Sequence, residues 1–385
     1  MRFEFATSNR ILFGQGIISE VPALAASIGQ RVAIIANSRE RCATLWKGLL
    51  ALGLSVEFIP VEKEPDLDSI LLATRKLHEF NCQLVIAFGG GSALDTGKAA
   101  AALMANPGDP LTYLEVVGSG QLLQNPSTAF IAIPTTAGTG SEVTRNAVIT
   151  LPEKRIKVSL RSPYMLPRVA VVDPELTYSL PPSITASTGL DALTQLIEPF
   201  VSNSSNPLTD SICRDGIVRA ARSLHKACEN GQDASAREDM ALASLFGGLA
   251  LANARLGAVH GMANPIGGFS RAPHGAVCAC LLPLVMETNL IALQTRLPDS
   301  PAIARYAELA GLLTGEGHAS AESGAAWVRK LCKSLDIRPL NEYGLNPDDF
   351  PAILAQSQKA NSMKGNPVDL TDSDLLSILV SAHAA

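Results

Sequence analysis

A glycine-rich segment, FGGGSALDTGK at residues 88–98, has the composition of a phosphate-binding turn. An apolar, β-prone run at 83–87 precedes it and an alanine-rich run at 99–104 follows it, which predicts strand, turn and helix start. Glycine lets the backbone approach a ligand closely, and the free amides at a helix N-terminus attract an anion. We therefore expect a phosphate-bearing cofactor at this turn.

The turn differs from the two best-known phosphate motifs. The dinucleotide fingerprint needs glycine at its first, third and sixth positions; Gly89 and Gly91 fit, but the sixth position is Leu94. The P-loop needs Ser or Thr after its lysine, whereas Ala99 follows Lys98. An ordinary strand–helix turn is the alternative, since glycine marks many such turns.

A second group of residues suits a metal ion. Among six histidines, His260 and His274 are each followed by glycine, and the Gly- and Pro-rich segment between them predicts a helix end, a loop and a helix beginning near His274. Asp191 and Gln195 are four residues apart, which places both on one face of a helix. One carboxylate with two imidazoles suits Fe²⁺ or Zn²⁺. Taken singly, each histidine is more often an ordinary structural residue, and no compact ligand motif joins them.

The cysteines give a weaker metal signal. Cys278 and Cys280 form a C-x-C pair that could be a soft metal site, although a free cysteine usually acts as a small buried hydrophobe. The seven cysteines are scattered and odd in number, so no disulfide framework is expected. A reducing cytoplasm is the expected compartment.

Bulk composition limits the partners. A formal charge of −5 provides no basic surface for nucleic acid. The first residues, MRFEFATSNR, lack the apolar core of a signal peptide, and the segment at 241–252, taken as the most apolar long stretch, is too short to span a bilayer. We expect neither a nucleic-acid nor a membrane partner.

The pattern of elements predicts two domains. Residues 1–180 alternate between strands and helices, which predicts a dinucleotide-binding α/β domain with a mostly parallel sheet. Residues 181–385 are mainly helical in pattern, and we expect them to form a second, all-α domain that holds metal and substrate. Ligands of parallel sheets lie beyond the C-terminal strand ends, where the glycine turn and PTTAGTGS at 134–141 both fall. The expected strands are 32–36, 55–60, 83–87, 129–133 and 169–172. The expected helices are 39–52, 67–80, 191–201, 209–230, 237–255, 275–289, 301–313 and 321–335.

Several long segments, in order, resemble the iron-containing alcohol dehydrogenase family, within the superfamily of glycerol dehydrogenase and dehydroquinate synthase. They are GGGSALDTGK at 89–98, PTTAGTGSEVT at 134–144, VVDPELTYSLPP at 171–182, TGLDALTQ at 188–195, GAVHGMANPIGG at 257–268 and APHGAVCACLLP at 272–283. The resemblance implies an active site in the cleft between the domains, and metal-assisted hydride transfer between a small alcohol or aldehyde and NAD(P)(H). It also implies a homo-oligomer such as a dimer.

The resemblance assigns roles to individual residues. It implies that the cofactor contacts are Gly90, Gly91 and Ser92 at the pyrophosphate, Asp95 near the nicotinamide ribose, Thr135, Thr136 and Thr139 in the nucleotide cleft, and Lys157. It implies that Asp191, His260 and His274 are catalytic metal ligands for Fe²⁺ or Zn²⁺.

Two positions depart from the family pattern. Gln195 stands where the family usually has a ligand histidine, and Asn264 stands where a histidine usually faces substrate and nicotinamide. A neutral amide oxygen is a weak ligand for either metal. Three interpretations follow: a three-ligand site resembling that of glycerol dehydrogenases, weak or water-mediated ligation by Gln195, or a site that binds no metal and polarises substrate by hydrogen bonds.

The remaining expectations concern specificity. The strand at 32–36 ends in Asn37-Ser38-Arg39, where no carboxylate repels a 2′-phosphate and Arg39 could pair with one, so we favour NADP(H) or dual use. The segments 246–255 and 264–269, beginning at Phe246 and Asn264, are expected to line the substrate pocket. Two alternatives to an alcohol dehydrogenase remain. One is a glycerol dehydrogenase-like or maleylacetate reductase-like oxidoreductase, and the other is a non-catalytic nucleotide-binding relic.

Overall fold

The computed structural model describes residues 2–115 and 117–384. These residues form two compact units. The sheet unit comprises Ala6–Thr136 and Gly140–Tyr178. The helical unit comprises the chain from Ser179 onward, together with Ala137–Thr139 and the N-terminal residues up to Phe5.

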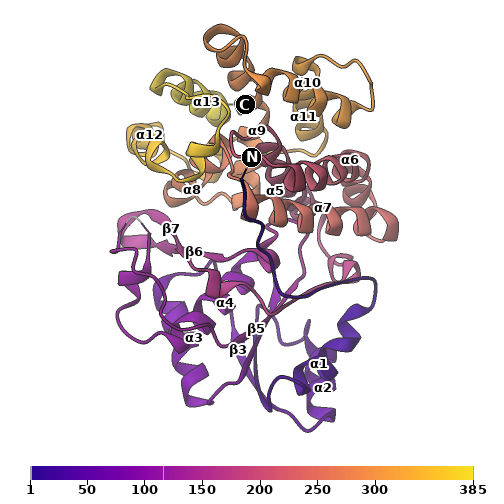
Figure 1. Ribbon diagram of the computed structural model, residues 1–385, viewed down its shortest axis with the longest axis vertical. Coiled ribbons are helices and arrows are strands. Elements are labelled where there is room, and N and C mark those ends of the chain that lie inside the picture. The colour runs from indigo at the N-terminus through magenta and orange to yellow at the C-terminus, as the bar shows by residue number, and fades with distance from the viewer. Residues whose placement is uncertain (1, 116, 385) are drawn as a thin grey trace. The chain divides into compact units, whose positions relative to one another are not determined.

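A six-stranded sheet organises the sheet unit, and every neighbouring pair of its strands is parallel (Figure 1). The strands run in the order β1-β8-β5-β4-β2-β3. Their bounds are β1 (Ile11–Phe13), β2 (Arg31–Ala36), β3 (Ser55–Pro60), β4 (Leu84–Gly89), β5 (Ala129–Pro134) and β8 (Val169–Val172). β4 is buried along its whole length, as an apolar strand covered on both faces should be. The predicted α/β class is confirmed.

Helices and one hairpin complete the sheet unit. The helices are α1 (Val21–Ala26), α2 (Ala43–Ala51), α3 (Leu67–Glu79) and α4 (Gly91–Ala105). α3 begins at a capping box. The Asp66 side chain accepts a hydrogen bond from the Ser69 amide, and the Ser69 hydroxyl oxygen accepts one from the Asp66 amide. The strands β6 (Asn146–Leu151) and β7 (Ile156–Arg161) form a separate antiparallel pair. Short 3₁₀ helices lie at Ile17–Glu20, Pro110–Tyr113, Ser141–Val143, Pro152–Lys154, Pro163–Met165 and Pro174–Thr177.

The strand order reverses between β2 and β4. From β2 the chain proceeds to β3 on one side, whereas β4 and then β5 lie on the other side. Ala36 of β2 pairs in register with Phe88 of β4, so the C-terminal ends of the two strands are adjacent. Such a reversal leaves a crevice at the strand ends where nucleotides bind, and the glycine turn follows β4 directly.

The described part of the helical unit contains helices and no strand. Its α-helices are α5 (Pro182–Val201), α6 (Pro207–Glu229), α7 (Ala234–Asn253), α8 (Ala258–Phe269), α9 (His274–Arg296), α10 (Pro301–Thr314), α11 (Ala321–Ser334), α12 (Phe350–Lys359) and α13 (Asp372–Ala384). Short 3₁₀ helices lie at Leu340–Tyr343, Pro347–Asp349 and Ser362–Gly365. α6 begins at a capping box formed by Asn206 and Thr209, with Pro207 in its first turn.

α9 is the longest strongly apolar helix in the described chain, so the expectation that 241–252 is the most apolar long stretch is wrong. By length and composition α9 could cross a bilayer, but most of it is buried inside the helical unit. Core helices of globular proteins share this composition because they are covered on all sides.

The segment between His260 and His274 also differs from its expectation. Residues 261–269, expected to be a loop, continue helix α8 despite Pro265. Val259, Met262 and Ile266 recur at helical spacing and are all buried, so the segment has an apolar face that a helix can pack against the core. The helix predicted to begin near His274 is confirmed.

Other boundaries moved or were missed. α2 begins at Ala43 rather than at 39, after a turn in which the Arg41 amide donates to the Ser38 hydroxyl. α5 begins at Pro182 rather than at 191, because proline is well suited to a first helical position. The strands β1, β6 and β7 were not predicted; β1 is short and only half-buried, so its apolar signal is weak.

Candidate metal centre and cofactor turn

One face of α5 supplies the acidic part of the candidate metal centre. Asp191, Gln195 and Glu198 follow one another at intervals of four and three residues, which aligns them along the helix. All three are buried. A β-carbon on Gly275 of α9 would lie 2.4 Å from the Ser187 carbonyl oxygen and 3.4 Å from Cβ of Asp191. Glycine at this position therefore allows the start of α9 to pack closely beside Asp191.

His260 lies in the first turn of α8, and two distant side chains cap that turn. The Val259 amide donates to Oε1 of Glu198 (2.7 Å), and the Ala258 amide donates to Oδ1 of Asn366 (3.1 Å). Both acceptors approach because the preceding residue is Gly257, whose β-carbon would lie 2.9 Å and 3.0 Å from them. The carboxylate also complements the positive end of the helix dipole.

Glu198 makes a second contact that orients His260. Its Oε2 lies 2.6 Å from Nδ1 of His260. An ionised carboxylate only accepts hydrogen bonds, so Nδ1 carries the hydrogen, and Nε2 on the opposite side of the ring faces Asp191 and Cys278. This carboxylate–histidine arrangement is the usual support of a metal-ligating imidazole.

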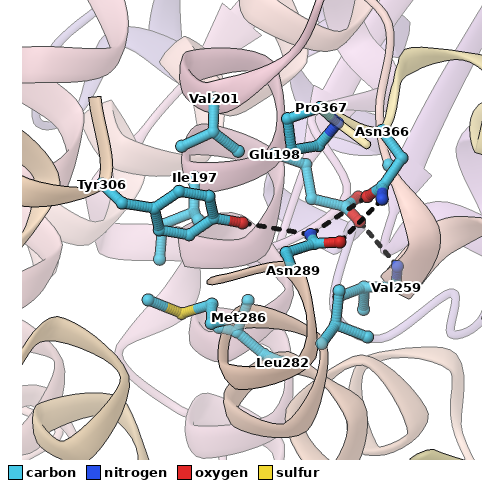
Figure 2. A pocket seen from close by; sticks show the side chains of 12 residues that line it. Ile197, Glu198, Val201, Val259, Leu282, Met286, Asn289, Tyr306, Asn366 and Pro367 are labelled. Carbon is cyan, nitrogen blue, oxygen red and sulfur yellow. Dashed lines mark hydrogen bonds between the residues drawn. The ribbon is translucent and has the colours of Figure 1, made fainter. Parts of the chain in front are cut away.

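Glu198 belongs to a buried polar group beside the metal centre. Figure 2 shows the side chains of Tyr306, Asn289 and Asn366 in a row beside Glu198. Asn289 Nδ2 lies 3.0 Å from the Tyr306 hydroxyl oxygen, and the Asn289 and Asn366 side chains exchange hydrogen bonds of 3.1 Å and 2.7 Å. These satisfied amides hold the cap of α8 in place without competing for the Glu198 carboxylate.

Four potential ligand atoms meet between α5, α8 and α9. Asp191 Oδ1 lies 3.4 Å from His260 Nε2 and 3.9 Å from His274 Nε2. Cys278, one helical turn after His274, places Sγ 3.9 Å from His260 Nε2 and 3.7 Å from His274 Nε2. All four atoms lie within 4.8 Å of one another. The structure thus brings together the three predicted residues and adds a thiol.

The charges of this cluster affect one another strongly. Burial would raise the pKa of Asp191, but the interactions with His260 and His274 outweigh it and hold this pKa below its ordinary value. Burial would lower the pKa of His260, but the negative potential of Cys278 and Glu198 outweighs it and raises this pKa well above the ordinary value. The pKa of His274 is also raised, chiefly by Cys278 acting against burial. The cluster therefore attracts positive charge.

Two buried oxygens in this part of the described chain lack a hydrogen-bond partner, Asp191 Oδ1 and Gln195 Oε1. A buried oxygen without a partner is destabilising, and a carboxylate oxygen more so than a neutral one. Beside two imidazoles, the partner that suits Asp191 Oδ1 is a divalent metal ion. The residues therefore fit such an ion.

Cys280 and the predicted substrate-pocket residues of the helical unit lie in different surroundings. Cys280 does not join Cys278, since its Sγ contacts the Arg338 carbonyl oxygen at 2.9 Å. Phe246 on α7 and Asn264 on α8 are half-buried, and Arg255 is exposed.

The glycine turn of the sheet unit gathers several predicted cofactor residues. A β-carbon on Gly89 would lie 2.8 Å from Oδ1 of Asn37, and one on Gly90 would lie 3.3 Å from Cγ2 of Thr136. The Thr135 amide donates to the Gly89 carbonyl oxygen (2.9 Å). The ends of β2, β4 and β5 therefore meet at this turn. Gly91 and Ser92 open α4 and are only half-buried, so the helix N-terminus is accessible.

Asp95 and Lys157 make contacts within the protein. Asp95 accepts from the Ser141 hydroxyl (2.6 Å) and from the Val148 amide (2.9 Å), which joins α4 to β6. Lys157 on β7 pairs with Glu64 (2.5 Å). These contacts fix both residues in the sheet unit.

Arg39 and Thr139 complete the predicted cofactor set. Arg39 is exposed, with its guanidinium 4.3 Å above the Trp46 ring. Thr139 belongs to the helical unit with Ala137 and Gly138.

Sequence reasoning missed Glu198 as a support and gave Cys278 only a weak metal role. A signal existed for each. Glu198 continues the helical face of Asp191 and Gln195, and Cys278 lies four residues after His274, a spacing that places two ligands on one helix face.

Comparison with known proteins places the chain in a family along most of its length. The family described as iron-containing alcohol dehydrogenase matches residues 8–174, and the C-terminal part of the Fe-containing alcohol dehydrogenase family matches residues 185–383. The chain is 43% identical to long-chain-alcohol dehydrogenase 1 of Geobacillus thermodenitrificans over 340 residues, 86% of this chain and 83% of that protein.

Solved structures show the same similarity. The fold superposes on a crystal structure of 1,3-propanediol oxidoreductase with a TM-score of 0.91 and 31% identity, covering 99% of this chain and 100% of that chain. It superposes on sulfoacetaldehyde reductase from Bifidobacterium kashiwanohense, in complex with NAD⁺, with a TM-score of 0.86 and 28% identity, covering 100% and 99%.

A nucleotide-binding sheet unit followed by a helical unit with a carboxylate–imidazole centre defines a metal-assisted, nicotinamide-dependent oxidoreductase. The chain belongs to the iron-containing alcohol dehydrogenase family. It is an alcohol dehydrogenase that interconverts alcohols and aldehydes, and enzymes of this family use NAD(H) and a divalent metal. The predicted family and activity are confirmed, which removes the alternative of a non-catalytic relic.

Proposed function

We propose that Asp191, His260 and His274 hold the divalent metal of this alcohol dehydrogenase. The observation that supports this role is the convergence of Oδ1 of Asp191 with the two Nε2 atoms, together with the lack of any hydrogen-bond partner for that buried oxygen. A bound metal of this kind supplies Lewis-acid polarisation of the substrate oxygen, and a bound nicotinamide supplies the hydride acceptor.

The protein's contribution is positioning. Glu198 fixes the ring of His260 so that Nε2 faces the cluster. His274 is 28% exposed, which leaves one side of the centre open to a substrate oxygen. Asn264 has no titratable group, so its amide positions substrate by hydrogen bonding and transfers no proton.

We assign the cofactor pyrophosphate to Gly90, Gly91 and Ser92. The exposed start of α4 provides amides and a positive helix end, and the strand order reverses at this point of the sheet. We extend the assignment to Asn37, Thr135 and Thr136, which lie beside the turn. Asp95, Thr139 and Lys157 remain further predicted contacts.

We propose that the enzyme uses NADP(H), or both cofactors. None of the three residues that follow β2, Asn37-Ser38-Arg39, carries a carboxylate, and the exposed guanidinium of Arg39, which lies over the Trp46 ring, suits pairing with a 2′-phosphate. The relative crystallised with NAD⁺ shows that the fold also accepts the cofactor without that phosphate.

We propose that Phe246 and Asn264 line the pocket for the alcohol chain. Both are half-buried; Asn264 lies on α8, one turn after His260, and Phe246 lies on α7 beside Gly247, which packs against Gln195. A homo-oligomer, such as a dimer, and a cytoplasmic location complete the proposal. The two-domain division at about residue 180 also forms part of it.

A screen of alcohols and aldehydes tests this function. Purified protein is stripped of metal with a chelator, then assayed with each cofactor before and after addition of Zn²⁺ or Fe²⁺. We expect turnover only after metal addition, and the absorbance of reduced nicotinamide measures it. Full turnover by protein that elemental analysis shows to be free of metal would contradict the proposed centre.

A further inference from the structure

We propose that Cys278 supplies a thiolate as the fourth ligand of this centre, in place of Gln195, and that the resulting Asp–His–His–Cys site selects Zn²⁺ over Fe²⁺. The inference rests on the proposed function to the extent that Asp191, His260 and His274 bind a metal. It adds a ligand to the three-residue site and increases the preference of that site for Zn²⁺.

The distances match a tetrahedral ion. Ligand atoms about 2.0–2.3 Å from a tetrahedral metal lie about 3.3–3.6 Å apart. Across the cluster, the carboxylate–imidazole distances are 3.4 Å and 3.9 Å, and the thiol–imidazole distances are 3.7 Å and 3.9 Å. Movements of a few tenths of an ångström would bring these four pairs to the spacing of tetrahedral ligands, and the remaining two pairs lie within 4.8 Å.

Backbone position explains why Cys278 can reach the site. Cys278 follows His274 by one turn of α9, and the close packing at Gly275 holds that turn against Asp191. The cysteine is fully buried. Cys280, two residues further on, contacts the Arg338 carbonyl oxygen instead, so α9 contributes one thiol and not a pair.

Gln195 is the weaker candidate for the fourth ligand. Its side chain interacts with the Asp191 carboxylate and helps to hold the pKa of Asp191 below the ordinary value. Its Oε1 lies 3.7 Å from the place of a β-carbon on Gly247 of α7. Gln195 therefore positions Asp191, and the thiol of Cys278 faces the two imidazoles.

Charge balance favours the same choice. Counting the ligands alone, Asp191 with two neutral imidazoles offers one negative charge to a divalent ion, and a thiolate brings the sum over the ion and its four ligands to zero. Glu198 adds a further negative charge behind His260 and is not itself a ligand. On binding, the bonds from the metal to Sγ and to the two Nε2 atoms form, the S–H bond and the N–H bond of each protonated Nε2 break, and these protons leave to solvent. Oxygen and nitrogen ligands already bind Zn²⁺ more tightly than Fe²⁺, and a soft thiolate ligand increases this preference. The exposed side of His274 leaves room for a substrate oxygen as a fifth ligand.

Cobalt substitution tests the ligand directly. Metal-free full-length protein is loaded with Co²⁺, and the near-ultraviolet spectrum is recorded for wild type, Cys278→Ala and Cys280→Ala. We expect a thiolate-to-cobalt charge-transfer band in wild type and in Cys280→Ala, and no such band in Cys278→Ala. Cys280 is the matched control because it is a buried cysteine of the same helix.

Two further measurements report on the sulfur ligand without Cys278→Ala, in case that variant does not fold. X-ray absorption of the wild-type zinc protein should show a sulfur neighbour at about 2.3 Å. Anaerobic dialysis against equal concentrations of Zn²⁺ and Fe²⁺ should give a zinc-to-iron ratio at least about tenfold higher in wild type than in the isosteric Cys278→Ser variant, by elemental analysis. A bound metal with no sulfur neighbour and no band would overturn the thiolate while leaving the three-residue centre intact. Failure of wild type to bind any Co²⁺ or Zn²⁺ would instead overturn the proposed function.

Discussion

Glu198 joins the start of α8 to the ring of His260: one carboxylate oxygen accepts from the Val259 amide, and the other lies 2.6 Å from Nδ1 of His260. The same side chain therefore fixes both the helix that presents the imidazole and the tautomer that the imidazole adopts. Glu198 of α5 thus controls both the position of the His260 ring and which of its nitrogens is free to bind metal.

We expect Glu198→Gln to lower metal affinity by about 10- to 100-fold, which is typical for loss of a carboxylate behind a ligating histidine. The glutamine oxygen can still accept from the Val259 amide, so the cap of α8 should survive. Chelator competition measures the affinity, and circular dichroism checks the fold. An affinity within a factor of two of wild type would show that Glu198 only caps the helix.

We expect Gly275→Ala to disturb the junction of α9 with α5. The added β-carbon would lie 2.4 Å from the Ser187 carbonyl oxygen, so α9 must shift, at a cost of about 1–3 kcal/mol in the free energy of unfolding. Because His274 and Cys278 move with α9, metal retention should also fall.

Gly317→Ala is the matched control for this change, since a β-carbon there meets no atom within 4 Å. Urea unfolding and elemental analysis of both variants give the comparison. Equal stability and metal content in the two variants would be inconsistent with the close packing at Gly275.

The fold was largely predictable from the sequence, whereas the centre was predictable only in part. The strands at β2 to β5 and β8 are apolar and β-branched runs with clear turn residues, so local pattern identified them. α8 was missed because Gly261, Pro265 and Gly267 disfavour a helix locally, and its caps come from Glu198 and Asn366, which are far away in sequence. Such long-range caps leave no local signal.

The metal ligands were likewise predictable only where the local sequence carried a signal. His260 and His274 could be selected because each is a rare residue in a distinctive context. Cys278 could have been separated from Cys280 by combining the predicted helix at 275–289 with the spacing from His274, because residues four apart share a helix face and residues two apart do not.

The sheet unit contains a buried acid whose titration should be measurable. Burial raises the pKa of Glu142 to about 7, although attraction to the buried Lys98 acts in the opposite direction. The folded state thus holds this proton more tightly than the unfolded state, in which glutamate has its ordinary value of about 4.3. The contribution to stability is complete below that value and is lost as the pH rises through about 7.

Glu142→Gln removes this titration. The variant should gain stability relative to wild type between pH 4.5 and pH 8, by at most about 3 kcal/mol in the free energy of unfolding. Denaturant unfolding of both proteins across this range gives the difference, with Glu153→Gln as an exposed control. A difference that is constant with pH would contradict a raised pKa at Glu142.

We expect Arg39→Ala to lower kcat/KM for the phosphorylated cofactor by about tenfold or more, because it removes a charge-assisted bond to the 2′-phosphate. The value for the unphosphorylated cofactor should change little, and it serves as the internal control. Equal losses with both cofactors would indicate that Arg39 supports the Trp46 region and does not read the phosphate.

The most direct measurement of the central claim is the metal content of Asp191→Asn, compared with wild type after identical purification and loading with Zn²⁺. The amide keeps the shape of the side chain but removes its charge. We predict one metal per wild-type chain and almost none in the variant, a loss of alcohol oxidation of roughly 10³-fold or more, and unchanged binding of reduced nicotinamide by fluorescence. A variant that retains one metal per chain and normal turnover would contradict the assignment of Asp191 as a ligand.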